Sequence, residues 1–278
     1  MSFFRYPGGK RKLRDTIAKR LKEYYQTEDL QYREPFFGGG SIGMWLLKDV
    51  KPSSMWINDF DIGIYCIWMS VCHYPAELCD RINSFHPKKD DFHTFRKELT
   101  TLKHLPIDAA EVVDIGFKKI AIHQISYSGL GTKSGGPLGG EKQESEYKID
   151  CRWSPPHMTK QIKHLSEILG PPLKLSITAV DFKDTIADTS EKALLYLDPP
   201  YYVKGNDLYQ CAFTLDDHIR LALALRDTKH KWLLSYDDCP EVRALYEWAT
   251  IEPLSVKYSI TTARTKSELL IYPNDIHT

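Results

Sequence analysis

Paired cysteines, long apolar runs and a net charge are all lacking in this sequence of 278 residues. Its six cysteines form no CxxC pair and no spacing typical of a zinc site, so we expect reduced thiols and no metal. The neighbouring Cys72 and His73 lie on an apolar helical pattern, which favours packing over metal binding. No apolar run approaches the ~20 residues that cross a bilayer, and the start MSFFRYPGGK lacks the apolar core of a signal peptide. We therefore expect no membrane partner and a cytoplasmic location.

The charge is balanced but unevenly spread. The chain has 37 Lys and Arg against 37 Asp and Glu, which gives no global support for a nucleic-acid partner. Residues 1–22 nevertheless hold eight Lys and Arg against Asp15 alone, and residues 118–163 hold eight against four acids. A basic face is therefore compatible with a neutral protein. For the first cluster, a solvated helix surface is an equally good explanation.

Short apolar segments alternate with helical patterns along most of the chain. This alternation predicts an α/β protein with a mostly parallel, doubly wound sheet of seven strands. The last two segments are separated by a short turn, so they should form an antiparallel hairpin at one edge. The first predicted strand is short and begins at Tyr32. The other six occupy residues 54–61, 173–182, 192–200, 230–238, 249–260 and 267–273.

More than a hundred residues separate the second and third predicted strands, whereas a crossover needs about a dozen. Helical patterns occupy residues 64–74, 91–102, 109–127 and 159–169, and a glycine-rich, lysine-containing loop occupies 128–148. We therefore predict a helical domain at 62–170 inserted into a sheet domain made of 1–61 and 171–278.

The string EPFFGGGSIG, residues 34–43, predicts a strand, a glycine turn and a helix with Ser41 as its N-cap. In an open parallel sheet, such a turn lets the backbone approach a ligand. Asp59 ends the next strand about twenty residues on, where a carboxylate commonly binds ribose hydroxyls. Together they suggest an adenosine-containing cofactor, although a simple tight turn remains an alternative. Neither the dinucleotide fingerprint nor the P-loop pattern fits, which favours a cofactor without phosphates.

The string LLYLDPPYY, residues 194–202, predicts a buried strand that stops abruptly at an acid and two prolines. Such a loop suits methylation of an exocyclic amine whose lone pair is conjugated with an aromatic base. The Asp198 carboxylate and the Pro199 carbonyl would accept the two N–H groups and draw the lone pair out of the ring. Tyr201 would offer a face on which an extruded base stacks. An ordinary Asp-Pro turn is the alternative.

These strings occur together in a known order. FFRYPGGK (3–10), EPFFGGGS (34–41), Asp59, the pair Asp181-Phe182 and DPPY (198–201) are followed by FTLDDHIRLA (213–222), LLSYDD (233–238) and KSELLIY (266–272). In these motifs the sequence resembles the N6-adenine DNA methyltransferases of the Dam type (D12 class, alpha group), in which a target-recognition insert separates cofactor loop from catalytic loop. The resemblance covers roughly residues 1–61 and 173–273.

The resemblance implies a Rossmann-like fold, S-adenosylmethionine as the cofactor and double-stranded DNA as the partner. The methyl group would pass directly to the N6 amine of a flipped-out adenine, with no metal. The catalytic positions are Asp198, Pro199, Pro200 and Tyr201. The cofactor positions are Tyr6 and Lys10 near the methionine end, Phe36, Phe37 and Gly38 around the turn, Asp59 at the ribose, Asp181 and Phe182 at the adenine, and Asp198.

The insert departs from the family pattern. Relatives that methylate GATC usually carry a loop resembling GEFNVPFG, whereas this chain has YSGLGTKSGGPLGG, so GATC specificity does not follow. We expect the loop to enter a DNA groove, with phosphates near Lys133, Lys142, Lys148 and Arg152.

Three alternatives remain open: the same chemistry on RNA adenine, the same chemistry on cytosine N4, and a DNA-binding relative without turnover. We expect a monomer on the nucleoid of a bacterium or on phage DNA. Whether a cognate restriction endonuclease accompanies it does not follow from the sequence.

Overall fold

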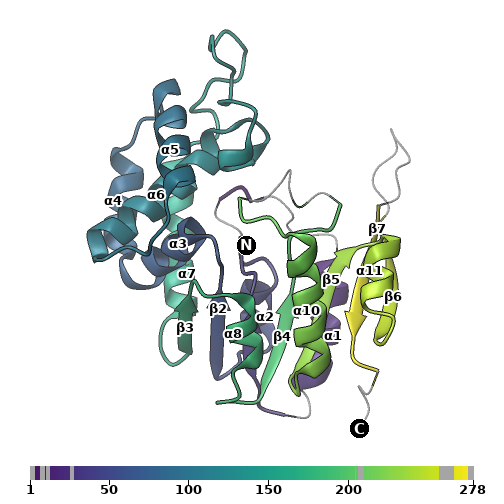
Figure 1. Ribbon diagram of the computed structural model, residues 1–278. Helices are drawn as coiled ribbons and strands as arrows, with labels where there is room; N and C mark the ends of the chain where they lie inside the picture. Colours follow the sequence, from purple (N-terminus) through teal and green to yellow (C-terminus); the bar gives the residue numbers. More distant parts are fainter. Residues whose placement is uncertain are drawn as a thin grey trace.

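A computed structural model of the protein describes residues 4–6, 10, 13–25, 28–203, 205, 210–256 and 266–274. Within these ranges seven strands form one sheet in the order β3-β2-β1-β4-β5-β7-β6 (Figure 1). The α/β prediction with its seven strands is therefore confirmed. The strands are β1 (Gln31–Glu34), β2 (Ser54–Asn58), β3 (Lys174–Thr178), β4 (Ala193–Leu197), β5 (Lys231–Asp237), β6 (Thr250–Val256) and β7 (Lys266–Tyr272).

The direction of the strands creates a binding edge. Strands β1 to β5 pair in parallel, whereas β7 runs antiparallel to both β5 and β6, which confirms the predicted edge hairpin. After β1 the chain builds outward through β2 and β3, and it then returns to place β4 on the other side of β1. Loops leaving β1 and β4 therefore diverge, and ligands bind at such switch points.

Strand β4 is buried on both sides because helices cover both faces of the sheet. Leu194 and Tyr196 pack in one core with α1 (Arg14–Tyr25) and α2 (Gly43–Asp49). Leu195 and Leu197 pack in a second core on the opposite face. This division follows from the alternation of side chains along a strand. The second core is covered by α8 (Phe182–Ala187), α10 (Leu215–Asp227) and α11 (Pro240–Leu245), which lie in front of the sheet in Figure 1.

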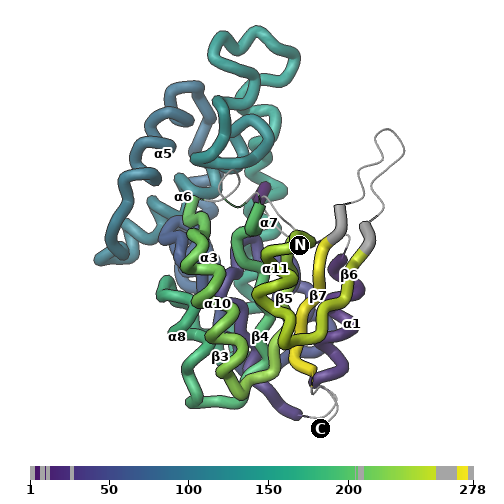
Figure 2. The backbone as a smooth tube through the Cα atoms, turned by 45° about the vertical axis from the view of Figure 1, so that its right-hand side comes forward, coloured from purple at the N-terminus to yellow at the C-terminus, as the bar shows by residue number. Residues whose placement is uncertain are grey.

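The segment between β2 and β3 is helical, as its pattern predicts. Figure 2 shows it rising beyond the sheet and carrying an extended loop. Its elements are α3 (Ile62–His73), α4 (Pro75–Ser84), α5 (Lys89–Thr101), α6 (Ala109–Ile125), two short 3₁₀ turns, η1 (Tyr127–Gly129) and η2 (Gly131–Lys133), and α7 (Pro155–Leu169). The sequence pattern did not predict α4. Pro75 occupies its first turn, where a missing N–H costs nothing, so the proline starts a helix there.

One predicted cap is wrong. Helix α2 begins at Gly43 with Ile42 at the N-cap, and no side chain caps it. Ser41 lies in the preceding turn and lines the cavity described below, because the tight glycine turn delays the first helical residue. No helix in the described ranges is long and apolar enough to cross a membrane.

Candidate active site

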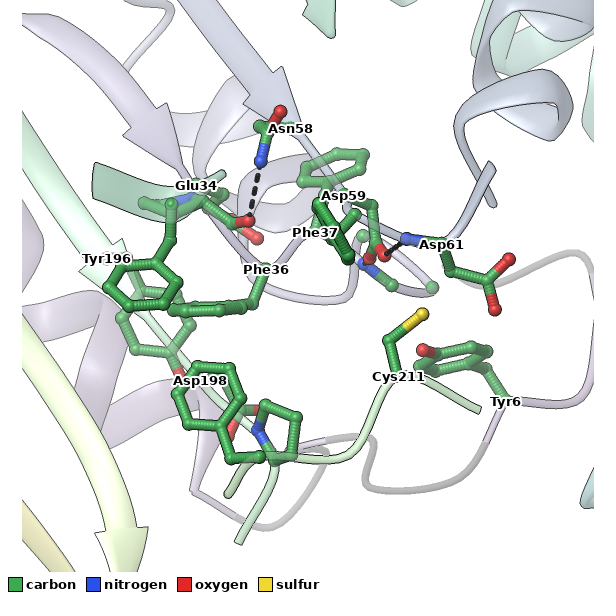
Figure 3. Close-up of a pocket in the computed structure, with 18 of the residues that line it drawn as sticks. Tyr6, Glu34, Phe36, Phe37, Asn58, Asp59, Asp61, Tyr196, Asp198 and Cys211 are labelled. Carbon is green, nitrogen blue, oxygen red and sulfur yellow. Dashed lines mark hydrogen bonds between the residues drawn. The ribbon is translucent and has the colours of Figure 1, made fainter. Parts of the chain in front are cut away.

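A cavity of about 350 Å³ opens at the carboxyl ends of β1, β2 and β4, which end at Glu34, Asn58 and Leu197. In Figure 3, Phe36 and Asp198 lie on its left, and Tyr6 and Cys211 on its right. The structure brings together most of the predicted site residues. Those lining the cavity are Tyr6, Phe36, Phe37, Gly38, Asp59, Asp181, Phe182, Asp198 and Pro200. Residues 3 and 7–9 of the predicted FFRYPGGK motif lie outside the described ranges.

The glycine turn after β1 presents bare backbone to the cavity. Gly38 and Gly40 have φ values of +48° and +64°, a region that side chains disfavour. A Cβ atom at Gly38 would stand 2.6 Å from the Tyr6 ring, and one at Gly40 would stand 2.8 Å from Trp68. The Trp68 indole N–H donates to the Gly38 carbonyl at 2.9 Å and fixes the turn. The glycines therefore meet a steric need of the turn itself.

Asp59 is held against this turn by two backbone groups. The Gly38 N–H donates to its Oδ2 at 2.8 Å, and the Asp61 N–H donates to its Oδ1 at 3.0 Å. A carboxylate has about four acceptor sites, so two remain for a ligand. Burial raises the pKa of Asp59 to about 7, and the negative charge of Asp61 adds to the rise. The carboxyl therefore titrates near neutral pH.

Three phenyl rings form the apolar wall of the cavity. The ring centroids of Phe36 and Phe182 lie 5.6 Å apart, and Phe213 lies 5.5 Å from Phe36 and 5.4 Å from Phe182. Such rings favour contact with a flat aromatic ligand. Phe213 was not predicted as a site residue, although it opens the FTLDDHIRLA string. A phenylalanine just before the capped start of α10 was the available signal.

Asp181 is less free than the sequence suggests. Its Oδ1 accepts the Lys183 N–H at 2.9 Å as the N-cap of α8, and its Oδ2 accepts Arg220 Nη2 at 2.7 Å. The Arg220 guanidinium also lies 5.1 Å from the centre of the Phe182 ring. Arg220 was not predicted, and it lines the same end of the cavity. Asp181 and Arg220 thus place a fixed carboxylate and a fixed cation beside the phenyl wall.

Lys10 lies against Asp198. The Lys10 Nζ stands 2.7 Å from Asp198 Oδ1, and the Ser235 hydroxyl donates to the same oxygen at 3.1 Å. Within the described part of the chain, Asp198 Oδ2 has no hydrogen-bond partner. Burial raises the pKa of Asp198, and the Lys10 charge opposes that rise. One oxygen is therefore held by the protein, and the other is free of hydrogen bonds to the described residues.

The chain around Tyr201 is fixed on both sides. The Tyr201 hydroxyl donates to Glu268 Oε2 at 3.0 Å and accepts a hydrogen bond from Lys10 Nζ. Asp237 accepts the N–H groups of Tyr202 and Val203, both at 3.0 Å. Pro199 is buried, and neither it nor Tyr201 lines the cavity. Ser235, Asp237 and Glu268 come from LLSYDD and KSELLIY, so those strings supply groups that hold the catalytic loop.

Glu34 is a second buried carboxyl on this side of the cavity. It is 3% exposed, and its Oε1 accepts a hydrogen bond from the Tyr32 hydroxyl. Burial raises the pKa of Glu34 to about 8, and the nearby Asp198 adds to the rise. Glu34 is therefore mainly protonated at pH 7.

The predicted phosphate contacts all lie on the surface. Lys133, Lys142, Lys148 and Arg152 are exposed, and Lys148 Nζ donates to the Gln143 carbonyl at 2.5 Å. Lys133, Lys142 and Lys148 belong to the glycine-rich loop 128–148, and Arg152 follows it. Among the described residues, no three His, Cys, Asp or Glu side chains form a metal-binding group.

Comparison with known proteins identifies the family. Residues 6–260, most of the chain, match the D12 class N6 adenine-specific DNA methyltransferase family. The chain is also similar to the type II methyltransferase M.MjaIII of Methanocaldococcus jannaschii, with 22% identity over 238 residues that cover 79% of this chain and 77% of the relative. The expected family and reaction are thus confirmed. The chain belongs to the D12 class of N6-adenine-specific DNA methyltransferases.

Proposed function

We propose that the cavity binds S-adenosylmethionine and that its Asp198 side receives an adenine flipped out of duplex DNA. The observation that carries this proposal is that the phenyl wall and Asp59 line the same cavity as Asp198. A methyl donor held by the phenyl wall and Asp59 would thus face an amine held by Asp198. The family supports the donor, because S-adenosylmethionine is the usual methyl donor of methyltransferases.

The residues present fit each part of this cofactor. Phe36, Phe182 and Phe213 suit a flat adenine, and the Asp59 carboxylate suits ribose hydroxyls. The bare backbone at Gly38 lets the Tyr6 ring pack against the turn, where we place the methionine end of the cofactor. The Asp59 carboxylate would repel a phosphate, which suits a cofactor without phosphates.

The protein's part in the reaction is positioning and hydrogen bonding. When bound, S-adenosylmethionine supplies an electrophilic methyl group. Asp198 Oδ2 accepts one N–H of the adenine amine, and the Pro199 carbonyl accepts the other, which localises the lone pair on nitrogen. The amine proton that methylation displaces would leave through its hydrogen bond to Asp198 Oδ2 and pass from there to solvent. Lys10 stays on Oδ1, where its charge favours the ionised form of the carboxyl and opposes the rise in its pKa caused by burial.

Extruding the base costs a few kcal/mol, which stacking in the site must offset. We propose Tyr201 for this stacking, since Glu268 and Lys10 already fix its hydroxyl. The helical segment 62–170 is the proposed DNA-binding domain, with its loop in a groove. We also propose that the enzyme acts as a monomer and, like a type II methyltransferase, alongside a cognate endonuclease.

Replacing Lys133 and Lys142 with glutamine should weaken DNA binding and make its salt dependence shallower. Each lost phosphate contact reduces the slope of log K against log salt by about one. The measurement is DNA affinity by fluorescence anisotropy at several salt concentrations. The matched control is Lys174→Gln with Lys229→Gln, an equal charge change at the amino ends of β3 and β5. Equal slopes for the two double variants would contradict a role of the loop in DNA binding.

Transfer of tritiated methyl groups from S-adenosylmethionine tests the proposal directly. We expect label in duplex DNA, recovered after hydrolysis as N6-methyladenine. RNA of the same sequence should remain unlabelled. Label found only in RNA, or only on cytosine, would refute the proposed substrate.

A further inference from the structure

The Gln210 side chain joins the cavity wall to three elements of the helical segment. Its Oε1 accepts Lys119 Nζ of α6 at 3.1 Å and the Thr132 hydroxyl of η2 at 3.0 Å. Its Nε2 donates at 2.8 Å to the Leu99 carbonyl, in the last turn of α5, where carbonyls lack a helical partner. Residues 210–213, which follow the catalytic loop, line the cavity. Gln210 therefore ties one wall of the cavity to the segment that carries the recognition loop.

Lys119 extends this connection to the cofactor side. Its Nζ lies 2.5 Å from Asp61 Oδ2, and the Lys119 side chain is only 3% exposed. Asp61 caps α3 through Oδ1 and donates its backbone N–H to Asp59. A continuous series of hydrogen bonds thus runs from Thr132 through Gln210, Lys119 and Asp61 to Asp59.

We propose that Gln210 is a positioning residue that couples DNA binding by the recognition loop to cofactor binding in the cavity. The inference rests on the proposed function and extends it. When η2 binds DNA, the Thr132 side chain would be held in place and would in turn hold the Gln210 amide. The amide would then hold the cavity wall at 211–213 and the Lys119–Asp61 pair. Because coupling between two binding equilibria is reciprocal, DNA should tighten cofactor binding by the factor by which cofactor tightens DNA binding.

The geometry favours a coupling role over mere packing. Both acceptor positions of Oε1 are used, one by Thr132 of η2 and the other by Lys119, which also pairs with Asp61 beside the cofactor side of the cavity. Thr132 is 8% exposed, so its hydroxyl bond to Gln210 is shielded from water. Losing such a bond typically costs about 0.5–1.5 kcal/mol, which corresponds to a factor of about two to ten in an equilibrium.

The test compares Thr132→Val with Thr132→Ser. Valine keeps the shape and loses the hydroxyl, whereas serine keeps the hydroxyl. The probe is S-adenosylhomocysteine, which cannot transfer a methyl group, and its Kd is measured with and without plasmid DNA. We expect DNA to tighten binding to the wild-type enzyme, Thr132→Val to reduce that tightening about two- to tenfold, and Thr132→Ser to restore it. Gln210→Met, which removes all three bonds, should abolish it. The control is Thr159→Val, whose hydroxyl bonds only within α7.

The outcomes separate this inference from the proposed function. If the wild-type enzyme fails to bind S-adenosylhomocysteine at all, the proposed function is wrong, and the inference falls with it. If the wild type binds it but DNA has no effect, or if Thr132→Val retains the full effect of DNA, the function stands and the coupling role of Gln210 is refuted.

Discussion

Asp198→Asn should lower the rate of methyl transfer to DNA by about 10²–10³-fold, the range seen when one group that stabilises a transition state is removed. Asparagine can keep its carbonyl on Lys10 and Ser235, which places its NH₂ where Oδ2 stood. A donor then faces the N–H of the target amine, so the lone pair is no longer drawn out of the ring. Single-turnover transfer with saturating cofactor measures this step.

The affinity for S-adenosylhomocysteine should change little in the same variant, because the phenyl wall and Asp59 are untouched. Asp238→Asn is the matched control: Asp238 follows β5 at the same edge of the sheet, outside the cavity lining, and pairs with Arg243. A normal transfer rate in Asp198→Asn would show that another group accepts the N–H bonds.

Cofactor binding should weaken by up to tenfold for each pH unit below about 7, with proton release when the cofactor binds. Burial raises the pKa of Asp59 from 3.8 to about 7 in the free enzyme. The contribution of this group to the free energy of unfolding of the protein therefore decreases as the pH rises between these values. Ribose hydroxyls donate to the ionised carboxylate and thus lower its pKa in the complex. Below pH 7, part of the binding free energy is therefore used to remove the proton.

Isothermal titration in buffers of different ionisation enthalpy measures the released protons. Asp59→Asn should bind S-adenosylhomocysteine about 10–100-fold more weakly at pH 8, because hydrogen bonds to a charged group contribute about 1.5–3 kcal/mol. Its affinity should also no longer depend on pH in this range. Asp61 and Lys119 lie close to Asp59, and Asp61→Asn shows how much of the dependence comes from its neighbour. A wild-type affinity that is constant from pH 5.5 to 8 would rule out this role of Asp59.

The sequence was sufficient for the sheet and for much of the site because both depend on local patterns. Continuous apolar runs such as 193–197 announce a strand buried on both faces, and motifs at strand ends place their residues at one edge. Asp59 and Asp198 therefore line the same cavity, although they are 139 positions apart in the sequence. The helix beginning at Pro75 was missed because a proline after an apolar helix resembles a stop.

The remaining site residues could not be found in this way, because their roles depend on contacts between distant segments. Gln210 belongs to none of the motifs, and its hydrogen bond to the Leu99 carbonyl joins residues 111 positions apart. Arg220 appears as an ordinary charged residue on α10, and only the fold brings it to Asp181. The contact between Lys10 and Asp198 likewise depends on packing between segments that are far apart in the sequence.

The helical segment leaves the sheet after β2 and re-enters at β3, and these two strands are neighbours. Recombination between relatives could therefore exchange the whole segment, and with it the DNA target if the segment has its proposed role, through a single pair of adjacent junctions. Gln210 adds a requirement beyond the two junctions. It lies outside the exchanged segment, but all three of its side-chain hydrogen bonds are made to residues within that segment. An incoming segment without a matching hydroxyl, ammonium and carbonyl would leave that amide unsatisfied, so viable chimeras should inherit all three or change residue 210 with them.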